Sequence, residues 1–81
     1  MLKIYGTRKC MDCITCIKTF DSKGIAYEFL DVVDNFDYFK EFIRLRDTNT
    51  IFDEAKEKGG IGIPCIRKED GSYTLDWESV M

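Results

Sequence analysis

The chain has 81 residues, a length that fits one small domain spanning positions 1–81. Hydrophobic residues account for 44% of it and charged residues for 33%, which is typical of a globular protein rather than a disordered or membrane-spanning one. Twelve basic and fifteen acidic side chains give a net charge of −3 without any dense Lys/Arg stretch, so we expect no nucleic-acid partner.

The beginning of the chain, MLKIYGTRKC, lacks the apolar stretch of a secretory signal, and no apolar run approaches the ~20 residues that cross a bilayer. We therefore expect a cytoplasmic protein with no membrane partner. Because that compartment keeps thiols reduced, the four cysteines favour catalysis or metal binding over structural disulfides.

The first part of the chain predicts a strand, a helix and a second strand. Residues 2–5 form a short apolar segment of β character. Residues 27–33 (YEFLDVV), with aromatic and β-branched side chains, predict the second strand. The helix between them is expected over residues 11–23, ending at Gly24. Its predicted buried stripe consists of Cys13, Ile17 and Phe20.

A second helix follows, capped by Asp34 or Asn35. The segment 47–50 (DTNT) interrupts this helix with poor helix formers. Thr50 is then expected to cap one or two further turns over residues 51–58. The expected apolar face of the second helix consists of Phe36, Phe39, Phe42 and Ile43.

The last part of the chain predicts two strands joined by a hairpin. Residues 59–62 (GGIG) predict a turn that lets the chain approach a site closely, and residues 61–66 are strand-like although they contain the only proline. The Asp-Gly pair at 70–71 is a strong hairpin signal before a returning strand at 73–75, and the final six residues hold at most one helical turn. The expected order is β-α-β-α-(α)-β-β, with a parallel crossover first and antiparallel strands last.

Cys10 and Cys13 form a CxxC motif at the junction between the first predicted strand and the first helix. The unpaired N–H groups and the dipole of a helix N-terminus stabilise a thiolate at Cys10, while Cys13 follows about one turn later, within reach of a mixed disulfide. Arg8 and Lys9 add positive charge beside Cys10, and Asp12 opposes them. A CxxC after the first strand of a β-α-β unit favours redox chemistry over metal binding.

The two remaining cysteines each leave two possibilities open. Cys16 belongs to a second CxxC inside the predicted helix, where we expect a small buried residue; the alternative is an auxiliary thiol that accepts the disulfide from Cys13. Cys65 follows Pro64 and is expected in the core, with a position facing the site as the alternative.

Two other functions stay open at this point. The four thiolates together would make an all-sulfur metal or iron–sulfur site, since the chain has no histidine. A non-catalytic interaction domain is the second alternative. Our leading prediction names no metal ligand.

Three segments together, KIYG-TRK-CMDC, FDSKGIAYEFLDV and GIP with its EDGS hairpin, resemble the glutaredoxin branch of the thioredoxin superfamily over nearly the full chain. This resemblance implies a thioredoxin-like, glutaredoxin-type α/β fold with a four-stranded mixed sheet, here with a truncated C-terminal helix. It also implies a nucleophile at Cys10, a resolving thiol at Cys13, and a cis-proline at Pro64 that faces the CxxC.

The implied activity is that of a thiol–disulfide oxidoreductase acting on protein or small-molecule disulfides. Its electrons would come from glutathione, as a possible cosubstrate, or from a flavoprotein reductase, and no cofactor is bound. Substrate or glutathione binding is expected at Arg8, Lys9, Ile63 and Pro64, with the Ile63 backbone pairing with the substrate. We expect a monomer.

Overall fold

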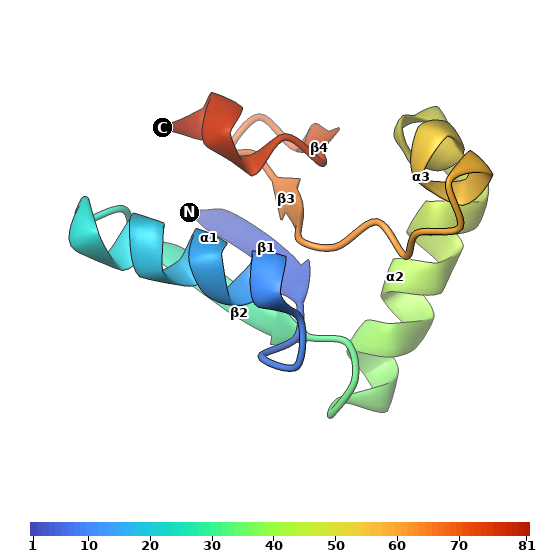
Figure 1. The fold of residues 1–81 in the computed structure, drawn as a ribbon, viewed down its shortest axis with the longest axis horizontal. Helices are drawn as coiled ribbons and strands as arrows, with labels where there is room; N and C mark the ends of the chain where they lie inside the picture. The colour runs from blue at the N-terminus through green and yellow to red at the C-terminus, as the bar shows by residue number, and fades with distance from the viewer.

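The computed structural model describes all residues 1–81 and shows a sheet with helices on both of its faces (Figure 1). The elements in chain order are β1 Leu2–Gly6, α1 Met11–Ser22, β2 Tyr27–Asp31, α2 Phe36–Thr48, a 3₁₀ turn Thr50–Phe52, α3 Asp53–Glu57, β3 Cys65–Arg67, β4 Tyr73–Thr74 and a second 3₁₀ turn Trp77–Val80. This order is the predicted one, and the final helix is reduced to a single 3₁₀ turn as expected.

The four strands form one mixed sheet in the order β2-β1-β3-β4. β1 pairs in parallel with β2, and α1 makes the crossover between them. β3 pairs antiparallel with both β1 and β4. The predicted α/β class with a four-stranded mixed sheet is therefore confirmed.

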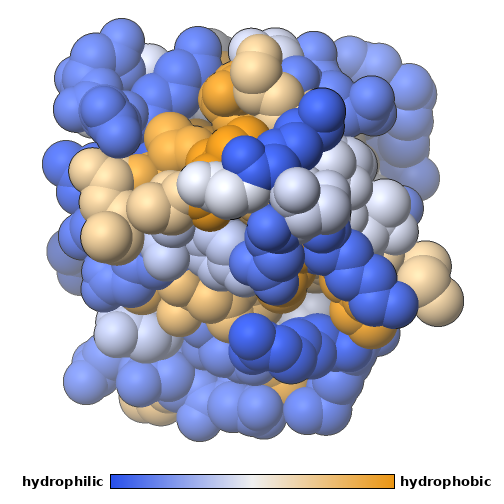
Figure 2. Space-filling model, turned by 90° about the vertical axis from the view of Figure 1, so that its left-hand side faces the viewer, coloured by the Kyte–Doolittle hydropathy of each residue, from blue (hydrophilic) through white to orange (hydrophobic).

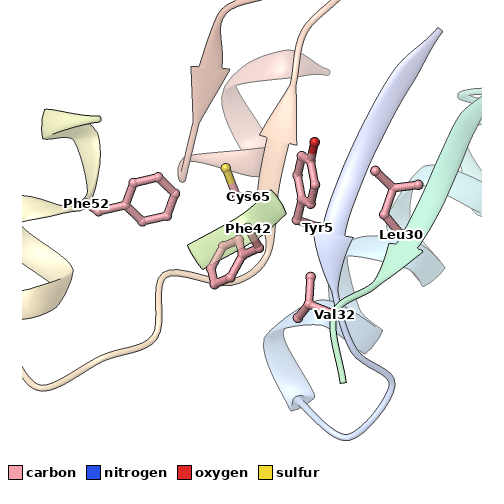
Figure 3. Packing of buried hydrophobic residues seen from close by; sticks show 6 residues of the cluster. All are labelled: Tyr5, Leu30, Val32, Phe42, Phe52 and Cys65. Atoms are coloured by element: carbon pink, nitrogen blue, oxygen red, sulfur yellow. The ribbon is translucent and has the colours of Figure 1, made fainter. Parts of the chain in front are cut away.

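Two apolar clusters lie on opposite faces of this sheet, because neighbouring residues of a strand point to opposite sides. Ile4 and Ile66 pack against Cys16 and Phe20, so α1 covers one face. Helix α2 and the 3₁₀ turn after it cover the other face, around Tyr5 (Figure 3). The cluster on that face consists of Tyr5, Leu30, Val32, Phe42, Phe52 and Cys65.

Both ends of α1 follow from local sequence rules. Cys10 is the N-cap residue, with extended backbone dihedral angles. At the other end Gly24 adopts a φ of +69°, and the Ile25 N–H donates to the Phe20 carbonyl at 2.9 Å. This is the glycine-terminated helix end expected from the sequence.

Phe36 and Phe39 lie on the predicted apolar face of α2, but this part of the face is not buried. Their side chains are 70% and 43% exposed, whereas Phe42 on the same helix is buried. Helical periodicity places all three on one side of α2, but the first turns of the helix follow directly on the loop that leaves β2, where the sheet ends (Figure 1). The sheet therefore covers only the later part of that side.

The second strand is shorter than predicted, ending at Asp31 rather than at Val33. The Asp31 side chain explains this end, because its Oδ1 accepts hydrogen bonds from the N–H groups of Val33 and Asp34, both at 2.9 Å. Such an aspartate turn takes the chain out of the sheet. Asn35 then caps α2 by accepting from the Tyr38 N–H at 3.1 Å, which decides between the two predicted caps.

The predicted cap at Thr50 is wrong, and the predicted strand over 61–66 is confirmed only at Cys65 and Ile66. Asn49, not Thr50, accepts the Ile51 N–H at 3.0 Å, and Thr50 is the first residue of the 3₁₀ turn. The strand begins only at Cys65, because Gly62 has a left-handed φ of +93° and Pro64 has no N–H for a ladder hydrogen bond. The returning strand ends at Thr74, one residue earlier than expected.

The end of the molecule farthest from α2, where α1 finishes and the C-terminus lies, is mostly hydrophilic, with smaller hydrophobic areas between the polar residues (Figure 2). None of the helices combines the length and apolar character that a membrane-spanning segment requires.

Candidate active site

Cys10 lies where the chain turns from β1 into α1. Its N–H donates to the Thr7 carbonyl at 3.2 Å, closing the turn, and its carbonyl accepts the Ile14 N–H at 3.1 Å as the helix begins. No side chain caps the helix N-terminus. The partly exposed Cys10 thiol therefore lies beside helix N–H groups whose dipoles favour negative charge.

Cys13 is fully buried behind Cys10, one helical turn along. Burial raises the pKa of the Cys13 thiol to about 12, a hydrogen bond from the Thr7 backbone opposes that rise, and the hydrogen-bonded Cys10 thiol adds to it. Both cysteines are free thiols in this structure. The pair thus consists of an accessible outer sulfur and a protonated inner sulfur in contact with it.

A cavity of about 700 Å³ opens at Cys10. It brings together Lys9, Ile63 and Pro64 with Cys10, so four of the residues predicted to form the site lie along one cavity. The Ile63–Pro64 peptide bond is cis, as the resemblance implied. The remaining lining residues are Thr7, Asp12, Val33, Ala55, Gly59, Gly60, Ile61, Gly62 and Leu75.

Arg8 and Lys9 engage other partners. The Arg8 guanidinium lies 4.6 Å from the centroid of the Phe29 ring, and Arg8 does not line the cavity. The Lys9 ammonium lies 3.2 Å from an oxygen of Asp34. The positive charge that the sequence places beside Cys10 is therefore directed in part toward these neighbours.

Cys16 and Cys65 are buried on opposite faces of the sheet, Cys16 with Phe20 and Cys65 with Tyr5. Burial raises the pKa of the Cys16 thiol to about 11 and that of the Cys65 thiol to about 12. Both expectations of a core position are confirmed. No three Cys, Asp or Glu side chains lie close enough together to share a metal ion.

Several cavity residues were not predicted from the sequence, notably Thr7, Val33 and Leu75. The Thr7 backbone contacts Cys13, and the Thr7 carbonyl accepts a hydrogen bond from the Cys10 N–H. The GGIG segment, expected to approach the site, does line the cavity.

Similarity to a known protein extends over most of this chain. The chain is 30% identical over 73 residues to an uncharacterized protein of Haemophilus influenzae, an alignment that covers 90% of this chain and 85% of that protein. The chain belongs to the family of this Haemophilus protein. No protein-family model matches the chain, and no solved structure matches it significantly.

Proposed function

We propose that this protein is a thiol–disulfide oxidoreductase of the thioredoxin superfamily, glutaredoxin-related, in which Cys10 attacks and Cys13 resolves. The observation that carries this proposal is the sulfur pair at the N-terminus of α1, with one thiol opening on a cavity and the other buried against it. The element order, the mixed sheet and the cis-proline beside the pair support a thioredoxin-like fold.

The first step forms a mixed disulfide. The Cys10 thiolate attacks one sulfur of a substrate disulfide, a bond forms between that sulfur and the Cys10 sulfur, and the other substrate sulfur leaves as a thiolate that takes a proton from water. The helix N-terminus stabilises the attacking thiolate, since its N–H groups carry no side-chain cap.

The second step releases the reduced substrate. Cys13 loses its proton to solvent and its sulfur attacks the Cys10 sulfur, so the Cys10–Cys13 disulfide forms as the bond to the substrate breaks. The second substrate sulfur leaves as a thiol, and two electrons have passed from the protein to the substrate. The raised pKa of Cys13 keeps this thiol protonated in the reduced protein.

Two thiol equivalents return the protein to its reduced state. Either two glutathione molecules supply them and become a glutathione disulfide, or a flavoprotein reductase supplies two electrons and two protons. Either donor supplies the two electrons and two protons that reduction of the Cys10–Cys13 disulfide requires. Coupled assays with each donor distinguish them.

The experiment is turnover of a small disulfide, bis(2-hydroxyethyl) disulfide, by the wild type and by cysteine variants. We expect Cys10→Ser to fall to the uncatalysed rate. We expect Cys13→Ser to accumulate a mixed disulfide that mass spectrometry detects at Cys10. Cys16→Ala is the matched control, because Cys16 lies in the core of the α1 face, and it should keep the wild-type rate. Full activity in Cys10→Ser would refute the proposal.

A further inference from the structure

A second cavity of about 760 Å³ adjoins the Cys10 cavity and is lined mainly by apolar side chains. Four residues line both cavities, so the two form one continuous surface: Thr7, Val33, Ile61 and Ile63. We call the second cavity the aromatic groove, because Phe36, Phe39 and Phe42 of α2 form one of its walls.

The aromatic groove exposes large apolar side chains to an unusual degree for so small a protein. Phe36 is 70% exposed, Ile61 60%, Val33 56% and Phe39 43%. The Phe36 and Phe39 rings are stacked, with centroids 6.1 Å apart. Exposed apolar groups that gather in one groove beside a reactive centre mark a binding surface more often than single scattered ones do.

The two charged side chains that line the aromatic groove, Asp34 and Arg46, already have partners within the protein. Asp34 binds the Lys9 ammonium at 3.2 Å, and Arg46 donates to the backbone carbonyls of Gly60 and Ile61, both at 2.9 Å. Apart from these two side chains and Thr7, the lining of the groove is apolar. A neutral apolar side chain matches the groove.

The Cys10 cavity is poorly suited to an anionic ligand such as glutathione, which carries two carboxylates. Lys9 is the one cationic side chain lining this cavity, and Asp34 neutralises it. Asp12 lines the same cavity with a carboxylate that forms no ion pair. The electrostatic balance beside Cys10 therefore favours a neutral segment over glutathione.

The backbone between the two cavities is available for pairing. The N–H groups of Ile61, Gly62 and Ile63 donate no hydrogen bond within the protein, and neither does the Ile63 carbonyl accept one. A bound polypeptide can add backbone hydrogen bonds to these unpaired groups, although the left-handed φ of Gly62 makes the segment no regular strand edge. A small-molecule disulfide has no backbone with which to do so.

From these observations we infer that the substrate is a disulfide within an extended polypeptide, with a large apolar residue next to the reacting cysteine seated in the aromatic groove. This inference rests on the proposed function and names the substrate class of the same site. The substrate sulfur bonds to Cys10, the backbone beside it pairs with Ile61 to Ile63, and the neighbouring apolar side chain is buried against Phe36 and Phe39.

The test uses short peptides whose single cysteine is joined to 5-thio-2-nitrobenzoate. Attack by Cys10 on the peptide sulfur breaks the mixed disulfide and releases one coloured thiolate for each new Cys10–peptide bond. The protein is the Cys13→Ser variant, so that the reaction stops at this step. One peptide carries Phe beside its cysteine, a second carries Gly there, and the mixed disulfide of glutathione is the third substrate.

We expect the Phe peptide to react at least ten times faster than the Gly peptide, and the glutathione disulfide to react no faster than the Gly peptide. Replacing both exposed rings, Phe36→Ser with Phe39→Gln, should remove the preference for Phe, so that the Phe and Gly peptides react at equal rates. Met81→Gln is the matched control, since it removes an exposed apolar side chain outside both cavities and should keep the preference.

Equal rates for the Phe and Gly peptides, or a glutathione disulfide that reacts faster than both, would overturn this inference and leave the oxidoreductase proposal standing. Reaction of none of the three, together with an inactive wild type toward bis(2-hydroxyethyl) disulfide, would overturn both. A Phe preference that survives the double replacement would also overturn the assignment to the groove.

Discussion

Gly6 lies directly behind Cys13, so closely that a Cβ atom on Gly6 would be 2.8 Å from the Cys13 sulfur. The contact joins the last residue of β1 to the inner thiol of the CxxC. Because Gly6 has no side chain, α1 can approach the sheet at the point where its first turn begins. The position of the Cys13 sulfur therefore depends on the absence of a side chain at Gly6.

Gly6→Ala should destabilise the protein by about 1–3 kcal/mol, because the new methyl group overpacks the buried sulfur. The test is a double-mutant cycle by urea unfolding. In a Cys13→Ala background the remaining contacts of the methyl group are ordinary ones of 3.5 Å, so the same substitution should cost clearly less. An equal cost in both backgrounds would show that the sulfur contact is not the cause.

Gly62→Ala should destabilise the protein more than Gly59→Ala does. Both glycines have left-handed backbones, with φ of +93° and +74°. At Gly62 the added Cβ would also lie 2.6 Å from the buried Phe52 ring, whereas at Gly59 it meets nothing within 4 Å. We expect about 1–2 kcal/mol for the conformational strain at either position, and a further ~1–3 kcal/mol at Gly62 for the clash.

Urea midpoints of the two variants measure this difference directly. Equal destabilisation of the two variants would mean that the Phe52 ring moves away from the new methyl group without a cost in stability. Both glycines line the Cys10 cavity, so the two variants are compared for stability and not for the rate of disulfide reduction.

The buried thiols should make the protein less stable as the pH rises above about 9. Burial raises the pKa values of Cys13 and Cys65 to about 12 and that of Cys16 to about 11, from an ordinary value of 9.0. Between these values the unfolded chain loses thiol protons that the folded protein keeps. The contribution of these thiols to the free energy of unfolding is therefore complete below pH 9 and is lost as the pH rises toward 12.

The measurement is the free energy of unfolding in urea at pH 7, 9 and 10.5, under reducing conditions. Each thiol contributes at most ~1.4 kcal/mol per pH unit inside this window. Cys65→Ala should lower the stability at pH 7 yet flatten its decrease at higher pH. A decrease equally steep in wild type and variant would contradict the assignment to Cys65.

Loss of the Asn35 cap should destabilise the start of α2. The Asn35 side chain accepts the Tyr38 N–H at 3.1 Å, so Asn35→Ala leaves that N–H without its side-chain acceptor. We expect a cost of ~1 kcal/mol, and Asn35→Asp should restore most of it because aspartate caps as well as asparagine. Thermal unfolding of the two variants tests this, and a destabilised Asp variant would argue against the cap.

The CxxC site was predictable because its parts are close in sequence. A strand that ends at Gly6, a short turn, and a helix that begins after Cys10 place both thiols by local rules alone. The hairpin at Asp70-Gly71 and the helix end at Gly24 follow from glycine conformations in the same way. Pro64 was assigned to the site through the resemblance, since nothing local brings residue 64 to residue 10.

The pattern of residues alone thus determined the order of the elements, the position of the CxxC thiols at a helix N-terminus and the burial of Cys16. Tertiary structure alone decided that Phe36 and Phe39 are exposed, that Asp34 forms an ion pair with Lys9, and that the aromatic groove joins the Cys10 cavity. The reason is physical. Local preferences fix how a residue lies on its own element, but its exposure depends on where other elements end, and that is settled only when the sheet packs.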